Sequence, residues 1–226
     1  MMVTRLVIIN AVVFLLLFNQ VVHKVPDQRT ENYSYKVENP NDNSQSFALK
    51  YLGLHEGLFF TNWEVWQAVT YGFLHGGWLH LFFNMLVLWF FGREVENIYG
   101  RYKFLGFYLS SIALSGIIGS YAQEFINILS QPNKASAPII GASGAVYAVM
   151  ILYVCLFPRR ILYLYFVLPV PAWALAVFLI VLGFFGMFGG SEIAHSVHRA
   201  GGACGLIYVK TGWDLSRCIP KRKQFQ

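Results

Sequence analysis

Residues 137–157 read APIIGASGAVYAVMILYVCLF. Pro138 disfavours a regular helix just upstream of it, whereas the apolar run that follows has the length of a membrane-embedded helix. We therefore expect a helix that begins near residues 141–143 and ends near Phe157. A single serine, Ser143, lies between two glycines at the start of this helix. The apolar run is typical of a helix in a core or a membrane, but the serine needs its own explanation.

The composition indicates a membrane protein. Of 226 residues, 56% are hydrophobic and only 12% are charged, whereas soluble domains carry roughly a quarter charged residues. The net charge of +6 comes from basic residues scattered at the ends of apolar segments, so no nucleic-acid partner is expected. The three cysteines form no CxxC pair, and we expect no metal and no cofactor.

Six apolar segments, each about long enough to span a bilayer, predict an all-α polytopic membrane protein with a bundle of six transmembrane helices. They lie near residues 5–22, 77–97, 102–125, 143–157, 162–188 and 193–211. We interpret residues 1–226 as one membrane domain. It has an external loop at about residues 23–76, partly formed by short interfacial helices, and a basic cytoplasmic tail at about residues 212–226.

The basic residues predict the orientation of the chain. Eleven of the 17 Lys and Arg residues fall on one side of the six segments, and the other six lie mostly in the long loop. Because basic residues are enriched in short cytoplasmic segments, both termini are expected in the cytoplasm.

Polar residues at membrane depth are candidates for function, because they are costly there. Ser143 lies fourteen residues before Phe157, which places it about 9 Å below the outer surface of a hydrocarbon core of about 30 Å. Asn84 and His198 lie about 10 Å and 9 Å below the same surface on two other segments. We therefore expect three helices to bring polar side chains to one level.

The Ser143 side chain has two possible roles. It can be a helix N-cap or a small packing residue, or it can be a nucleophile with free backbone N–H groups beside it for an oxyanion. A nucleophilic serine needs a base. His198 precedes Gly201 and Gly205, a small-residue face that matches Gly144 and Ala148, so His198 is preferred over His195. Gly141 and Gly144 leave room for a substrate backbone.

His80 and Asn84 lie one helical turn apart on the same face. They either hydrogen-bond inside the bundle or act as side-chain donors to an oxyanion. Tyr147 lies one turn beyond Ser143 and either fills the core or packs against the ring of His198.

Over residues 63–211 the sequence resembles the rhomboid family of intramembrane serine proteases. The resemblance rests on HLFFN (80–84), GREVE (92–96), GASG (141–144) and HRAGGACG (198–205). It implies Ser143 as nucleophile, His198 as general base and acid, and an oxyanion hole of Asn84, His80 and the Ser143 N–H. It also implies that Tyr147 packs on the histidine and that Glu96 ties helix ends together.

Two positions depart from the family pattern: Gln67 replaces a common loop arginine, and Arg199-Ala200 replaces a frequent Leu-Gly. HExxH is absent, which disfavours a metalloprotease. Asp214 is the only aspartate near a segment, which disfavours an aspartyl protease because that class needs two intramembrane aspartates. A small transporter would not be expected to have this Ser–Gly–His–Gly combination.

The functional hypothesis is a serine endopeptidase that cleaves transmembrane protein substrates within the lipid bilayer of a bacterial plasma membrane. A catalytically inactive rhomboid-like binding or quality-control protein is the alternative. Loss of serine or histidine would be typical of that alternative, and both residues are present.

Overall fold

The computed structural model describes residues 1–21, 23–26, 33–36, 47–55, 63–130, 138–164, 168–184 and 192–211. The helices are α1 (Met2–Val21), α2 (Phe47–Leu52), α4 (Gln67–Thr70), α5 (Trp78–Tyr99), α6 (Arg101–Ser130), α7 (Ser143–Leu156), α8 (Ala172–Phe184) and α9 (Glu192–Thr211), with a 3-10 helix η1 (Tyr71–Phe73). Two antiparallel hairpins pair β1 (His23–Pro26) with β2 (Tyr33–Lys36) and β3 (Ile161–Leu164) with β4 (Leu168–Pro171).

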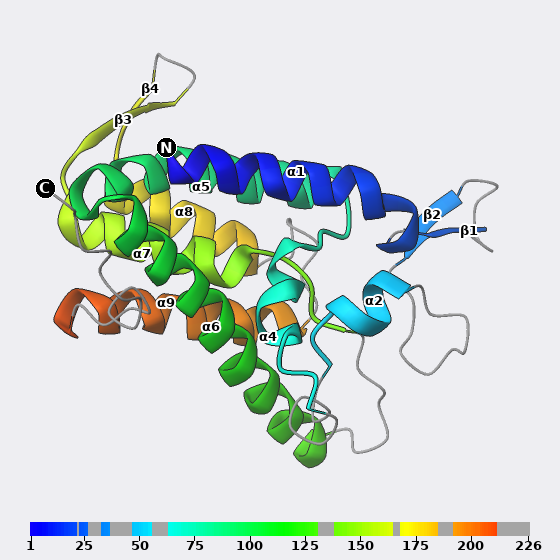
Figure 1. Ribbon diagram of the computed structural model, residues 1–226. Coiled ribbons are helices and arrows are strands. Elements are labelled where there is room, and N and C mark those ends of the chain that lie inside the picture. The colour runs from blue at the N-terminus through cyan, green and yellow to red at the C-terminus, as the bar shows by residue number, and fades with distance from the viewer. Residues whose placement is uncertain are drawn as a thin grey trace, which may run out of the picture.

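Helix α7 is the centre of a helical bundle (Figure 1). Helices α5, α6, α8 and α9 all contact it, whereas α1 packs mainly on α5. Ala145, Ala148, Val149 and Leu152 of α7 have no exposed surface. An apolar helix of which most residues are buried is typical of the middle of a large core or a membrane bundle.

The outer surface of the bundle is apolar and part of its interior is polar. Leu16 of α1 and Leu79 of α5 are 74% and 67% exposed. Ser110 and Ser115 of α6 are buried and donate hydrogen bonds to carbonyls of their own helix. This arrangement suits a lipid solvent, in which backbone and side-chain polar groups must be satisfied inside the protein.

The number of spans differs from the expected six. Among the described residues, one helix is both long and apolar enough to cross a membrane, Arg101–Ala122 of α6. A second span is obtained if residues 67–73 and α5, which meet at a bend of 100°, are counted together. The apolar stretches Met2–Phe18, Ser143–Leu156 and Ala172–Val181 are shorter. The predicted helical bundle is therefore present, but six full-length spans are not established.

The fifth predicted segment, residues 162–188, is wrong in its first third. Residues 161–164 and 168–171 form the β3–β4 hairpin, and helix α8 begins only at Ala172. Pro169 and Pro171 explain the difference, because proline lacks the N–H that a helix interior needs. Residues 185–188 of the predicted segment lie outside the described residues.

The two ends of the bundle are distinct (Figure 1). The start of α1 and the end of α9 lie at one end together with the β3–β4 hairpin. The β1–β2 hairpin, α2 and the start of α7 lie toward the other end. The loop predicted at residues 23–76 thus contains a hairpin and short helices where it is described. The basic tail at 212–226 lies outside the described residues.

Candidate active site

Ser143 is the first residue of α7, and its surroundings argue against a capping role. The N-cap position belongs to Ala142, and no side-chain hydrogen bond caps the helix. Within the part of the chain that the structure describes, no hydrogen bond involves the Ser143 hydroxyl. The side chain is therefore available for chemistry at a helix start, where N–H groups remain unpaired and the helix dipole is positive.

The chain that leads into Ser143 is held in place by backbone hydrogen bonds. Ile139 pairs with Leu54 in an isolated bridge, with N···O distances of 2.8 and 3.1 Å. The Gly141 N–H donates to the Tyr71 carbonyl at 2.9 Å. Leu54 and the first residue of η1 thus position the start of α7.

Gly141 is required for both its conformation and its lack of a side chain. Its φ of +118° lies where L-residues with a Cβ are strained. A Cβ there would lie 2.7 Å from Nε2 of His80 and 3.9 Å from Oγ of Ser143. Gly141 therefore lies where the side chains of His80 and Ser143 come near each other.

The protonation of His80 follows from its neighbour Gly76. The Gly76 N–H donates to Nδ1 of His80 at 3.4 Å. In a neutral imidazole one nitrogen accepts and the other donates, so Nε2 carries the hydrogen. That donor nitrogen is the one that faces Gly141. His80 can thus present an N–H toward the region above Ser143.

Asn84 offers a second donor one turn along α5. Its side chain is 7% exposed, and its Nδ2 has no hydrogen-bond partner among the described residues. An unpaired buried donor costs about 1–3 kcal/mol. A group that the fold keeps unpaired at this cost is suited to bind an acceptor that arrives with the substrate.

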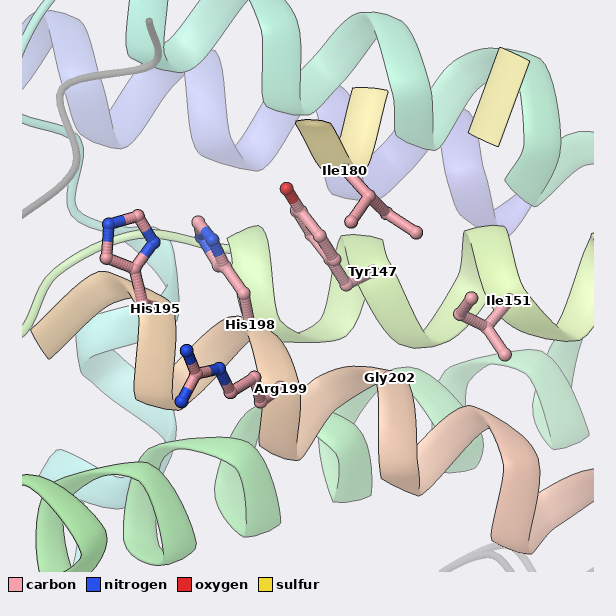
Figure 2. Close-up of a pocket in the computed structure, with 7 residues that line it drawn as sticks. All are labelled: Tyr147, Ile151, Ile180, His195, His198, Arg199 and Gly202. Carbon is pink, nitrogen blue, oxygen red and sulfur yellow. The ribbon is translucent and has the colours of Figure 1, made fainter. Parts of the chain in front are cut away.

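His198 and Tyr147 stack in parallel. Their ring centroids are 4.3 Å apart and their planes differ by 7°, and Figure 2 shows the two rings face to face between α7 and α9. The Tyr147 hydroxyl donates to the Leu179 carbonyl of α8 at 3.5 Å. Tyr147 therefore limits the orientations available to the imidazole.

Helices α7 and α9 touch through their glycines. A Cβ at Gly201 would overlap the Gly144 carbonyl group, and one at Gly205 would lie 2.6 Å from the Ala148 carbonyl oxygen. Ser143 adjoins Gly144, and His198 lies one turn before Gly201. The close contact thus brings the serine and histidine backbones together, although no hydrogen bond joins their side chains among the described residues. Such bonds are often long in proteins without substrate.

A rhomboid domain matches residues 62–214. The chain belongs to the rhomboid family. The resemblance drawn from the four motifs is therefore confirmed, and the fold is that of an integral membrane protein.

Several rhomboid proteins are similar to the chain over about two thirds of its length. It is 34% identical over 157 residues to RHOMBOID-like protein 12, mitochondrial, from Arabidopsis thaliana, which covers 66% of this chain and 46% of that protein. It is 32% identical over 167 residues to rhomboid protease GluP of Bacillus subtilis, covering 73% of this chain and 29% of that protein. With rhomboid protease GlpG of Haemophilus influenzae it shares 30% over 145 residues, 64% and 68% of the two chains. The chain thus spans about half or less of the length of the Arabidopsis and Bacillus relatives.

Gln67, one of the two departures noted from the sequence, is fully buried and well bonded. Its Oε1 accepts from the His55 N–H at 3.3 Å, and its Nε2 donates to the Lys50 carbonyl and to Glu64, at 3.3 and 2.6 Å. The amide therefore ties α2, α4 and the segment between them, so the substitution does not leave this part of the loop unanchored.

Glu96 joins the ends of two helices. Its carboxylate is 6% exposed and accepts hydrogen bonds from the N–H groups of Met2 and Val3, at 2.6 and 2.8 Å. A carboxylate at a helix N-terminus satisfies unpaired N–H groups and interacts favourably with the dipole. This contact holds the start of α1 against α5.

Two neighbours of the site were not singled out from the sequence. His75 is 1% exposed, its ring lies 5.0 Å from that of His80, and neither of its nitrogens has a hydrogen-bond partner among the described residues. Arg199 and His195 line a pocket with His198. Arg199 was noted only as a departure from the family, and its place in this pocket could not be read from one sequence.

Proposed function

We propose that this rhomboid is an intramembrane serine endopeptidase. The observation that carries the proposal is a free serine hydroxyl at the start of α7, beside a helix that carries a stacked histidine. The protease names of the bacterial relatives GluP and GlpG support the same reaction.

In the proposed mechanism the Ser143 hydroxyl attacks the carbonyl carbon of a peptide bond while His198 removes its proton. The imidazolium then gives that proton to the leaving amine, and water hydrolyses the acyl-enzyme with the same histidine as base. Asn84 Nδ2, His80 Nε2 and the Ser143 N–H are proposed as donors to the tetrahedral oxyanion. Losing one such donor typically costs a factor of about 10²–10³ in kcat.

The proposed substrates are transmembrane segments of other proteins. A helix already uses its own peptide groups in hydrogen bonds, so a segment must unwind locally before Ser143 can attack it. Small or helix-breaking residues near the cut are expected to favour cleavage. Equal cleavage of strongly helical, leucine-rich segments would contradict this expectation.

The proposed location is a bacterial plasma membrane, with both termini in the cytoplasm and Ser143 toward the outer side. The start of α1 and the end of α9 lie at the same end of the bundle, which supports the proposal that both termini lie on one side of the membrane (Figure 1). The relatives include both mitochondrial and bacterial proteins.

The test is to label the purified protein with a fluorophosphonate and to assay cleavage of a transmembrane substrate. Ser143→Ala is expected to abolish both signals and His198→Ala to reduce both by at least about 10³-fold. Ser110→Ala is a matched control, because this buried hydroxyl bonds only to its own helix. Labelling or cleavage that survives Ser143→Ala would refute the assignment. Wild-type protein that neither labels nor cleaves, but still binds membrane proteins, would favour the inactive rhomboid-like alternative.

A further inference from the structure

A pocket lies beside His198, between α7, α8 and α9 (Figure 2). Tyr147 and Ile151 of α7 and Ile180 of α8 form its apolar side. His198, Arg199 and Gly202 line it from α9, together with His195 one turn earlier. Because His198 belongs both to this pocket and to the candidate dyad, whatever occupies the pocket lies next to the site of chemistry.

The polar side chains of the pocket are all nitrogen bases or cations. Apart from the Tyr147 hydroxyl, the polar groups that line it among the described residues are two imidazoles and the Arg199 guanidinium, with no aspartate or glutamate. A pocket with a cation at its rim and apolar walls is complementary to a short anionic side chain, in charge and in polarity.

Arg199 has no internal partner within the described part of the chain. Elsewhere, Arg160 pairs with Glu94 at 3.0 Å, and the guanidinium of Arg93 lies 4.6 Å from the ring centroid of Trp89. Arg199, by contrast, is exposed and has neither an ion pair nor a hydrogen bond there. A cation near membrane depth is costly unless it is paired, and in membrane proteins such residues often mark the path of a substrate.

The occupant follows from the geometry of acyl transfer. A peptide that acylates Ser143 lies within reach of His198, and an extended chain advances about 3.3 Å per residue. A side chain within three residues of the cut bond therefore comes within about 10 Å of His198, and Arg199 is the next residue of α9. A lipid headgroup has the same charge, but nothing requires it to lie beside the histidine.

We propose that this pocket binds an aspartate or glutamate of the protein substrate, within three residues of the cleaved bond, and that Arg199 pairs with its carboxylate. The proposal rests on the proposed function and narrows its substrate class to transmembrane segments with an acidic residue near the cut. Arg199 then determines specificity and takes no part in bond cleavage.

The experiment compares transmembrane substrates that carry Asp, Asn or Lys at each of three positions on either side of the cut. With the full-length wild type in phosphatidylcholine vesicles, Asp is expected to raise kcat/KM about fivefold at one position or more. Arg199→Leu should bring this ratio to about one, and Arg199→Glu should invert the preference in favour of Lys. Arg199→Lys should retain part of it, because it keeps the charge but not the planar fork. Arg93→Leu is the control and should keep the wild-type ratio.

Binding to Ser143→Ala protein separates this proposal from the proposed function. Tighter binding of the Asp substrate that is lost in Ser143→Ala/Arg199→Leu supports the pocket even if no cleavage occurs, in which case the protease assignment alone fails. A wild-type ratio of one at every position, or a ratio that persists in Arg199→Leu, overturns the pocket. An Arg199 effect that needs phosphatidylglycerol and ignores the substrate residue also overturns it and points to a lipid. Thermal unfolding of Arg199→Leu shows whether a lost ratio reflects a lost fold.

Discussion

Helix α9 meets α7 and α8 in different ways. Against α7 the contact is glycine on backbone, with no room for a methyl group at Gly201 or Gly205. Between α9 and α8 the structure instead has a pocket, rimmed by Arg199 and Ile180. We infer that the tight side fixes the distance between the proposed nucleophile and base, because packed backbones resist displacement. Under the proposed function, the open side would leave room for a substrate to reach them.

The largest effect is expected at the tight contact. Gly201→Val places a side chain into the Gly144 carbonyl group, so we expect destabilisation of more than about 3 kcal/mol and loss of activity. Thermal unfolding should show a fall in Tm of about 10 °C. Gly202→Val is the matched control, since the nearest atom to its Cβ is 3.9 Å away. Equal losses of stability in the two variants would show that the tight contact is not special.

The proposed oxyanion donors should affect rate without affecting stability. Asn84→Ala removes a donor with no partner among the described residues, so we expect kcat to fall by about 10²–10³ while Tm changes little. Initial rates on a transmembrane substrate measure the fall in kcat, and a thermal scan measures Tm. Asn10→Ala on α1 is the control for rate, because the Asn10 side chain bonds to the Leu6 carbonyl of its own helix. A large fall in Tm for Asn84→Ala would mean that this residue is structural.

Truncating a side chain should cost more stability on α7, at the tight contact, than on α8, at the pocket. Leu152→Ala on α7 removes a fully buried side chain and should cost about 2–5 kcal/mol. Ile180→Ala on α8 truncates a side chain that is 37% exposed and should cost less than about 1.5 kcal/mol. Denaturation of the two variants in one detergent gives the comparison. Similar costs would indicate that α8 is held as firmly as α7.

The smallest effect concerns the ring that stacks on His198. Tyr147→Ala should lower kcat about tenfold, because aromatic pairs contribute about 0.5–1.5 kcal/mol beyond their buried area. Tyr147→Phe keeps the ring and should stay within about twofold, since the hydroxyl makes only a 3.5 Å bond to Leu179. If the Phe variant lost as much rate as the Ala variant, the hydroxyl would have a role of its own.

Much of the helical layout could be predicted from the sequence, because a few residues have strong local preferences. Pro138 and Gly141 place the start of α7 near residue 143, and long apolar runs find the bodies of α5, α6 and α9. The fifth segment is wrong in its first third because apolar character alone does not distinguish one long helix from a hairpin followed by a shorter helix. The prolines at 169 and 171 are the signal that the helix begins only after residue 171.

The surroundings of the site could be predicted only in part. The small residues Gly144 and Gly201 suggested a close helix contact, because such faces are recognisable along one chain. The Gly76 contact that sets the His80 tautomer depends on three-dimensional arrangement, as do the bonds of Gln67 and the position of Arg199 in a pocket. No local pattern predicts which side chain is left without a partner.

The length of the central helix has a mechanical consequence. Helix α7 has 14 residues and is therefore about 21 Å long, against a hydrocarbon core of about 30 Å. Because α5, α6, α8 and α9 surround α7, the remaining depth of about 9 Å is enclosed by protein and not by lipid. We expect water to enter this enclosed depth, so the shortness of α7 would set how far water must travel to reach Ser143.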